Sequence, residues 1–172
     1  VASTTSVSCY GASTGAASVT ATPTGTYTYT WQPGNLNGAS QTGLAAGVYT
    51  ISASNGTCTG TVTVNITQPT ALTASITATS PASCGANNGV VTVSASGGTA
   101  GYTYTWSPSG GNAATASNLA GGSYTVTIKD ANSCTVATTA SVTTTSTATL
   151  SVNSTTVCAG TPSTLTVSGA TT

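Results

Sequence analysis

The feature that most constrains this chain is an internal repeat of about 75 residues. Cys9 and Cys84 are 75 residues apart (84 − 9 = 75), and the stretch "TYTYTW" at 26–31 returns as "GYTYTW" at 101–106. The same spacing holds for Leu44 with Leu119 and for Tyr49 with Tyr124. Self-similarity at a fixed offset is the signature of tandem modules, each of which is one structural unit.

Each repeat predicts short β-strands and no helix. Apolar and polar residues alternate in "ASVTAT", "TYTYTW", "VYTISAS" and "GTVTVNIT", with turn-forming stretches such as "QPGNLNG" and "SGGTAG" between such segments. About seven short strands in roughly 75 residues are typical of an antiparallel immunoglobulin-like β-sandwich. We therefore expect tandem all-β sandwiches. The expected units are residues 1–68, whose first strand is incomplete, residues 69–144, and a truncated third unit at 145–172 that begins before Cys158.

The near-absence of charge excludes most kinds of chemistry. Lys129 and Asp130 are the only charged side chains, and the chain has no His. Acid–base catalysis needs a His or a pair of carboxylates, so we expect no enzyme and no catalytic residue. The residue types for a metal site or a phosphate-binding basic surface are missing as well. We therefore predict no metal, no cofactor and no nucleic-acid partner.

Two further features of the composition bear on the surroundings of the chain. No apolar run approaches the ~20 residues of a spanning helix, which predicts no membrane insertion. The neighbouring pair Lys129–Asp130 falls after the strand-like "SYTVTI" and before "ANSC". We interpret this pair as a solvated turn at the end of a strand.

The cysteines recur at matching places in the two full repeats. We predict one disulfide inside each unit, Cys9–Cys58 and Cys84–Cys134, with Cys158 unpaired in this segment. Closing a loop of about 50 residues stabilises a small domain by ~4 kcal/mol in the chain-entropy model. Disulfides indicate an oxidising, extracytoplasmic location. The alternative is a set of reduced, buried thiols in a cytosolic protein.

The aromatic ladder can be interpreted in two ways. On a strand, Tyr27, Tyr29 and Trp31 share one face and the threonines between them share the other. Such a face, with its second copy Tyr102, Tyr104 and Trp106, forms either the core beside a disulfide or an exposed platform that stacks a sugar. We favour the core, because carbohydrate sites usually add acidic residues. The threonine face resembles an ice-binding surface, but a twisted sandwich strand is not flat enough for that role.

Three sequence triplets match the N-glycosylation acceptor pattern, at Asn55, Asn65 and Asn153. Each triplet is a weak signal, because such matches arise by chance in a chain rich in Thr. The hydroxyl-rich outer faces are also candidates for O-linked sugar, which would add solubility to a chain of zero net charge.

Taken together, "YTYTW", "LAGGSYTV" and "DANSCT" resemble the SprB-type repeat. The second unit resembles it across most of 71–142, and the first from Cys9 to Cys58, with Asn55 near the place of an acidic residue. The start of the third unit, "VCAGTPSTLTVSGA", is similar to immunoglobulin-like modules. The resemblance implies tandem modules of very large surface adhesins of Bacteroidota, outside the cell, and it supplies no catalytic residues.

These observations lead to one functional prediction and one alternative. We expect a structural module of an extracellular fibre or giant cell-surface adhesin, whose partners are copies of itself that associate through uncharged β-rich surfaces. The alternative is a glycan-binding module that uses the Tyr/Trp ladder to stack surface glycans.

Overall fold

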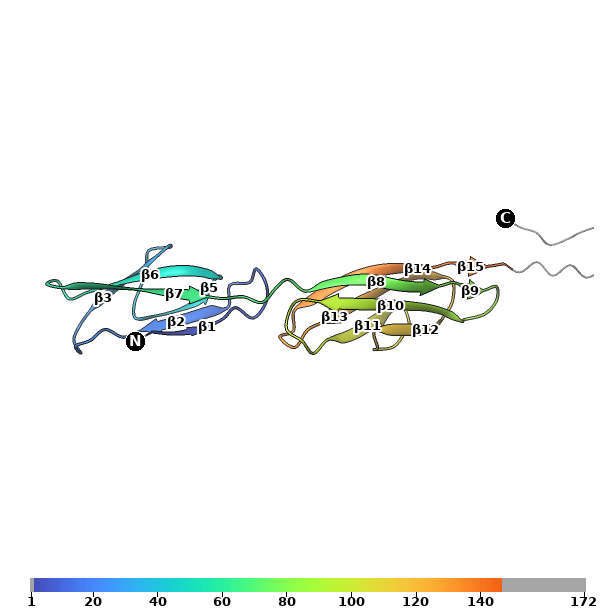
Figure 1. Ribbon diagram of the computed structural model, residues 1–172, viewed down its shortest axis with the longest axis horizontal. Helices are drawn as coiled ribbons and strands as arrows, with labels where there is room; N and C mark the ends of the chain where they lie inside the picture. Colours follow the sequence, from blue (N-terminus) through green and yellow to red (C-terminus); the bar gives the residue numbers. More distant parts are fainter. Residues whose placement is uncertain (1, 147–172) are drawn as a thin grey trace, which may run out of the picture.

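The computed structural model describes residues 2–146 and arranges them as two β-sandwiches placed end to end (Figure 1). The described residues contain strands and turns but no helix. Both sandwiches are built from antiparallel sheets, which confirms the predicted all-β, immunoglobulin-like fold. Nearly all of the expected third unit, from residue 147 on and with Cys158 and Asn153, lies outside the described residues.

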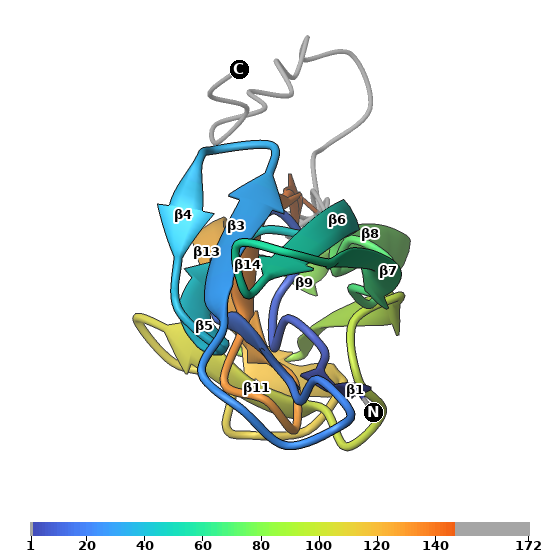
Figure 2. The same ribbon diagram turned by 90° about the vertical axis from the view of Figure 1, so that its left-hand side faces the viewer.

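The first sandwich contains strands β1 to β7 in two sheets. One sheet has the order β1(Ala2–Thr5), β2(Gly15–Val19), β5(Ser40–Leu44). The other has the order β4(Leu36–Asn37), β3(Thr28–Gln32), β6(Gly47–Ser54), β7(Thr59–Ile66). Figure 2, which looks from the left-hand side of Figure 1, shows this sandwich in front of the second one.

The second sandwich repeats this plan with strands β8 to β15. One sheet has the order β12(Thr115–Leu119), β10(Gly89–Ser96), β8(Thr73–Ser80), and the other has the order β11(Thr103–Ser107), β13(Gly122–Lys129), β14(Thr135–Val142). A short parallel pair, β9(Ala82–Ser83) and β15(Thr144–Thr145), closes the far end of the molecule in Figure 1.

Each sandwich has its own core, because the alternating pattern directs every second side chain inward. Trp31 and Ile51 face each other across β3 and β6, and both are fully buried. Trp106 and Val126 occupy the same places in the second sandwich. The two hydrophobic clusters share no residue, so each domain buries its own apolar surface.

The repeated "LAxGxY" motif forms the same corner in both domains. The Tyr49 hydroxyl donates a hydrogen bond to the Ala45 carbonyl at 3.2 Å, and the Tyr124 hydroxyl donates to the Ala120 carbonyl at 3.1 Å. The hydroxyl of each buried tyrosine thereby has a hydrogen-bond partner in the preceding turn, as buried tyrosine hydroxyls usually do.

Candidate functional site

The junction between the two domains is closed by a disulfide. Cys9 lies between β1 and β2, and Cys134 lies in the turn between β13 and β14. The structure joins these two residues, whose Cα atoms are 5.7 Å apart, and leaves Cys58 and Cys84 as exposed free thiols. This corrects the predicted pairs Cys9–Cys58 and Cys84–Cys134, because the bond links one domain to the next.

The physical reason lies in the length of the strands. Cys58 precedes the first residue of β7, whereas Cys9 lies beside the chain that leaves β7, since the Val7 N–H donates to the Thr67 carbonyl at 2.8 Å. An eight-residue strand such as β7 spans about 26 Å, and disulfide Cα atoms must come within roughly 7 Å. The two cysteines of one domain therefore lie at its opposite ends and cannot meet.

The turn that carries Cys134 is organised by Asp130. One carboxylate oxygen accepts the N–H groups of Asn132 at 2.9 Å and Cys134 at 2.8 Å, and the other accepts the Thr99 N–H at 2.9 Å. Asp130 is only 3% exposed, so the interpretation of Lys129–Asp130 as a solvated turn is wrong for the carboxylate. The side chain is buried because the loop that contains Thr99 folds over it.

The same contacts set the charge state of this carboxylate. The N–H of Thr99, followed by those of Cys134 and Asn132, lowers the pKa of Asp130, while burial of the group acts in the opposite direction. The ionised form is the one that accepts these bonds. Asp130 is therefore a structural anion that fixes the turn next to the disulfide.

A second contact crosses the junction beside the disulfide. The Asn132 side-chain amide donates to the Ser8 carbonyl of the first domain at 3.0 Å and to the Thr99 hydroxyl at 2.9 Å. The Asp130 turn thus touches the first domain through Asn132 as well as through Cys134. The end of the second domain that meets the first is therefore held in shape by the hydrogen bonds of Asp130 and Asn132.

The chain that connects the domains crosses this surface over two glycines. The Gly98 N–H donates to the Thr70 carbonyl at 2.9 Å, and both Gly97 and Gly98 have positive φ. A Cβ atom at Gly97 would overlap the Ala71 carbonyl, and one at Gly98 would lie 2.6 Å from an Asp130 oxygen. The turn therefore requires glycine, both for its left-handed backbone and for the passage of the linker.

The outer end of the first domain carries a counterpart of the Asp130 turn. Asn55 takes the place of Asp130 and accepts the N–H groups of Thr57 at 3.0 Å and Cys58 at 2.8 Å. Asn55 is exposed, and so is Asn65 on β7. Both remain candidate glycosylation sites, and in Asn55 the side-chain oxygen is already engaged in the turn.

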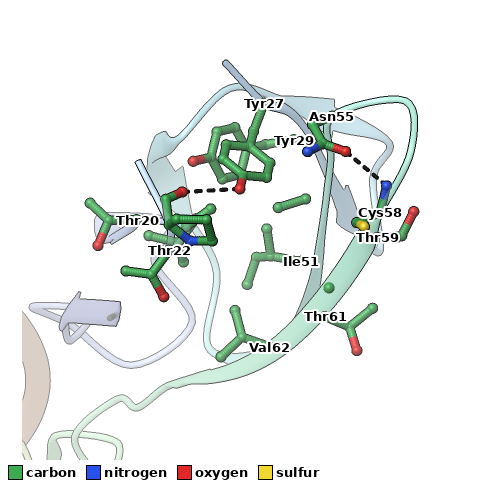
Figure 3. Close-up of a pocket in the computed structure, with 15 residues that line it drawn as sticks. Thr20, Thr22, Tyr27, Tyr29, Ile51, Asn55, Cys58, Thr59, Thr61 and Val62 are labelled. Atoms are coloured by element: carbon green, nitrogen blue, oxygen red, sulfur yellow. Dashed lines mark hydrogen bonds between the residues drawn. The ribbon is translucent and has the colours of Figure 1, made fainter. Parts of the chain in front are cut away.

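A pocket of about 410 Å³ lies beside Cys58 (Figure 3). Its lining includes the half-buried side chains of Tyr27 and Tyr29, with Ile51 at its base and Val62 on β7. In the second domain β10 extends to Ser96 alongside β8, whereas the corresponding β2 ends at Val19. The pocket opens at this shorter end of the first sheet.

The structure places the aromatic ladder with its rings inward. Trp31 and Trp106 are buried, and each indole N–H donates to a carbonyl, at Gly38 and Ala113 respectively. The four tyrosines are half-buried, and the threonines between them are exposed. Tyr102 and Tyr104 pack against the core cluster of the second domain, and Tyr29 packs against that of the first. Tyr27 and Tyr29 also line the pocket.

Two other kinds of site are absent from the described residues. Within residues 2–146, no three His, Cys, Asp or Glu side chains come close enough together to hold a metal ion. The same part of the chain has no helix that is long and apolar enough to cross a membrane.

Two sandwiches joined end to end by a linker and a disulfide define a tandem extracellular structural module, because such bonds persist outside the reducing cytosol. The SprB repeat model matches residues 1–36 and 76–111, segments that begin 75 residues apart (76 − 1 = 75). The chain is therefore similar to the SprB repeat at two places, one at the start of each unit, and it is a cell-surface or extracellular protein.

Solved structures give a more distant likeness. A Dscam structure from work on isoform specificity is 13% identical with a TM-score of 0.37, over 69% of this chain and 38% of that chain. The extracellular domains 3–5 of Drosophila OTK are 15% identical with a TM-score of 0.33, over 69% of this chain and 51% of that one. No curated protein sequence matches the chain.

Proposed function

We propose that the chain is a load-bearing module of an extracellular fibre or giant cell-surface adhesin. The observation that carries this proposal is the disulfide between Cys9 and Cys134, which bonds consecutive sandwiches end to end. A bond between domains adds nothing to either core, but it holds the two domains in line. This is the requirement of a module whose work is mechanical.

Self-association of such modules is the finer part of the proposal. Edge strand β7 has mostly exposed residues, among them Val62, and β14 repeats its pattern with Thr, Ala and Val. Neither strand carries a Lys, the residue that most often prevents pairing between sheet edges. Uncharged faces also remove the repulsion that keeps most proteins apart.

Electron microscopy and sedimentation of the purified chain test the proposal. The triple variant Cys58→Ser, Cys84→Ser, Cys158→Ser keeps the Cys9–Cys134 bond and excludes every other disulfide. We expect this variant to form filaments or higher oligomers as its concentration rises, with an axial step of one or two units. Monomers throughout the concentration range would refute non-covalent association.

The pocket at Tyr27 and Tyr29 supports glycan binding as a second candidate function. The two rings lie 6.4 Å apart between centroids, and the exposed hydroxyls of Thr22, Thr59 and Thr61 surround the opening. Titration of neutral oligosaccharides, followed by NMR shifts of the tyrosine rings, tests this candidate. Binding that is lost in Tyr29→Ala and retained in Tyr104→Ala would establish it, and unchanged spectra would end it.

A further inference from the structure

The two free thiols occupy the same structural positions as the two bonded ones. Cys58 follows β6 as Cys134 follows β13, and the backbone N–H of each donates to the turn residue, Asn55 or Asp130, at 2.8 Å. The turns also close alike, through the Asn55 N–H to the Cys58 carbonyl at 3.2 Å and the Asp130 N–H to the Cys134 carbonyl at 3.0 Å.

The other free thiol, Cys84, is the counterpart of Cys9. Cys9 lies two residues after the buried Val7, whose N–H donates to the Thr67 carbonyl at 2.8 Å. Cys84 lies two residues after the buried Ala82, whose N–H donates to the Thr143 carbonyl at 2.9 Å. Cys9 and Cys84 thus each lie close to the segment that follows the last long strand of their domain, β7 or β14.

The two exposed thiols lie at opposite ends of the pair of sandwiches. Cys58 belongs to the turn between β6 and β7 at the left end of Figure 1, and Cys84 follows β9 at the right end of the sandwiches. The pair of sandwiches therefore presents one half of its internal junction at each end. A contact between unlike ends is heterologous, and repeated without closure it generates a filament.

We propose that Cys84 of one copy bonds to Cys58 of a second copy, in the arrangement that Cys9 and Cys134 show within the chain. The proposal deepens the proposed function, on which it rests, by naming the bond between modules. Copies joined in this way form a covalent row in which every junction carries the same disulfide.

The turn beside Cys58 differs from the turn that the linker crosses in the internal junction. The difference favours a separate copy as the partner of Cys58. Tyr27 donates to the Pro23 carbonyl at 3.0 Å, and Tyr102 donates to the Gly97 carbonyl at 2.6 Å, so Pro23 and Thr24 stand where Gly97 and Gly98 do. These two positions carry side chains, whereas in the internal junction the passage of the linker leaves no room for a Cβ atom at Gly97 or Gly98. A disulfide between copies needs no such passage.

The bond requires an oxidant, for which a small disulfide such as oxidised glutathione suffices. A thiolate attacks the small disulfide, releases one glutathione thiol and leaves a mixed disulfide. The second protein thiolate then attacks the protein sulfur of that mixed disulfide and releases the second glutathione. Two protein thiols are oxidised, one small disulfide is reduced, and the two protons pass to the released thiolates.

The test mixes two variants in a glutathione redox buffer, with Cys158→Ser in every chain. The Cys58→Ser chain offers only Cys84, and the Cys84→Ser chain offers only Cys58. We expect the mixture to give a heterodimer in roughly tenfold excess over the homodimers that each variant gives alone, because the docked ends raise the local thiol concentration. The chain that keeps both thiols should give a ladder of oligomers on a non-reducing gel.

A matched control moves the thiol within the same surface. Thr61 is exposed and lines the pocket beside Cys58. A Cys58→Ser, Thr61→Cys, Cys84→Ser chain should give no excess of heterodimer with the Cys84 chain. Peptide mass mapping should find Cys58 joined to Cys84 in the heterodimer and Cys9 still joined to Cys134.

Two results would overturn the linkage. One is formation of homodimers as fast as heterodimers, which indicates random oxidation of exposed thiols. The other is quantitative alkylation of Cys58 and Cys84 after incubation in the oxidising buffer. If the triple serine variant still forms filaments in either case, the proposed function stands and only the disulfide between copies is refuted.

Discussion

At the scale of single residues, Asp130 and Asn55 occupy the same position in equivalent turns, one as a carboxylate and the other as an amide. Both side chains accept backbone N–H groups from the residues that lead to a cysteine. Only Asp130 also accepts an N–H from a distant loop, that of Thr99. The carboxylate therefore ties its own turn to a distant loop, whereas the amide binds only within its own turn, and it does so at the junction between domains.

Acidification should weaken the second domain through this carboxylate. Its pKa is lowered from the ordinary 3.8, so the ionised form contributes stability that is complete above about pH 4. That contribution is lost as the pH falls through the lowered pKa of the folded state. Hydrogen exchange of the Thr99, Asn132 and Cys134 amides between pH 5 and pH 2 measures the effect. Asp130→Asn should remove this pH dependence, and an unchanged profile in that variant would contradict the assignment.

The sequence could identify Asp130 as one of only two charges, but it could not predict its burial. Burial depends on the loop at Thr99, 31 residues earlier in the chain, which comes close only after both sheets have formed. A carboxylate next to a lysine at a strand end is usually solvated, and that expectation failed here for this reason. The repeated "NGTC" and "DANSC" turns were the available signal that the position is structural.

At the scale of elements, strand β11 shows how the repeat encodes a core. Its tyrosine and its tryptophan face inward at alternate positions and its threonines face outward, so one pentapeptide specifies both surfaces of the sheet. The period of two was readable from the sequence, and it placed strands and faces correctly.

Substitutions on the two faces of β11 should differ sharply. Trp106→Ala removes a side chain that is 6% exposed, and we expect it to cost about 3–5 kcal/mol of unfolding free energy. Thr105→Ala, on the exposed face of the same strand, should change that free energy by less than about 0.5 kcal/mol. Urea unfolding of the two variants provides the comparison, and equal costs would mean that the faces are assigned wrongly.

The glycine turn at the junction gives a second prediction for this scale. Gly97→Ala strains a backbone with φ of 75° and pushes a methyl group into the Ala71 carbonyl. Gly85→Ala is the matched control, because its φ is 71° and nothing lies within 4 Å of the added atom. We expect the control to cost about 1 kcal/mol and Gly97→Ala distinctly more. Thermal unfolding of the two variants measures these costs. Similar losses of stability would show that the linker does not pack on this turn.

At the scale of the whole molecule, the pairing of the cysteines is the point at which the prediction from sequence failed. Their recurrence at matching places was correct, but matching places in a repeat do not say which copies pair. The deciding fact is that an eight-residue strand separates the two cysteine positions of one domain. That fact could have been drawn from the predicted strands, since "GTVTVNIT" begins at Gly60, two residues after Cys58.

Reduction of Cys9–Cys134 should loosen the junction and leave both domains folded. Each domain keeps its own core, and the reduced chain loses the constraint of a loop with sequence separation 125, worth about 5 kcal/mol in the chain-entropy model. Small-angle scattering of Cys9→Ser should show a broader distribution of overall dimensions than the oxidised chain, with near-ultraviolet circular dichroism of the tryptophans unchanged. Loss of the tryptophan signal would mean that the disulfide supports a core.

The double connection at this junction has a mechanical consequence. Neighbouring domains joined by one flexible peptide can swivel about it, whereas a peptide and a disulfide attached at separate points leave one bending axis and resist torsion. Tension along the row divides between the two paths, so the linker carries only part of the load. Reduction of the disulfides by the surroundings would then convert a stiff row of domains into a flexible one without unfolding any domain.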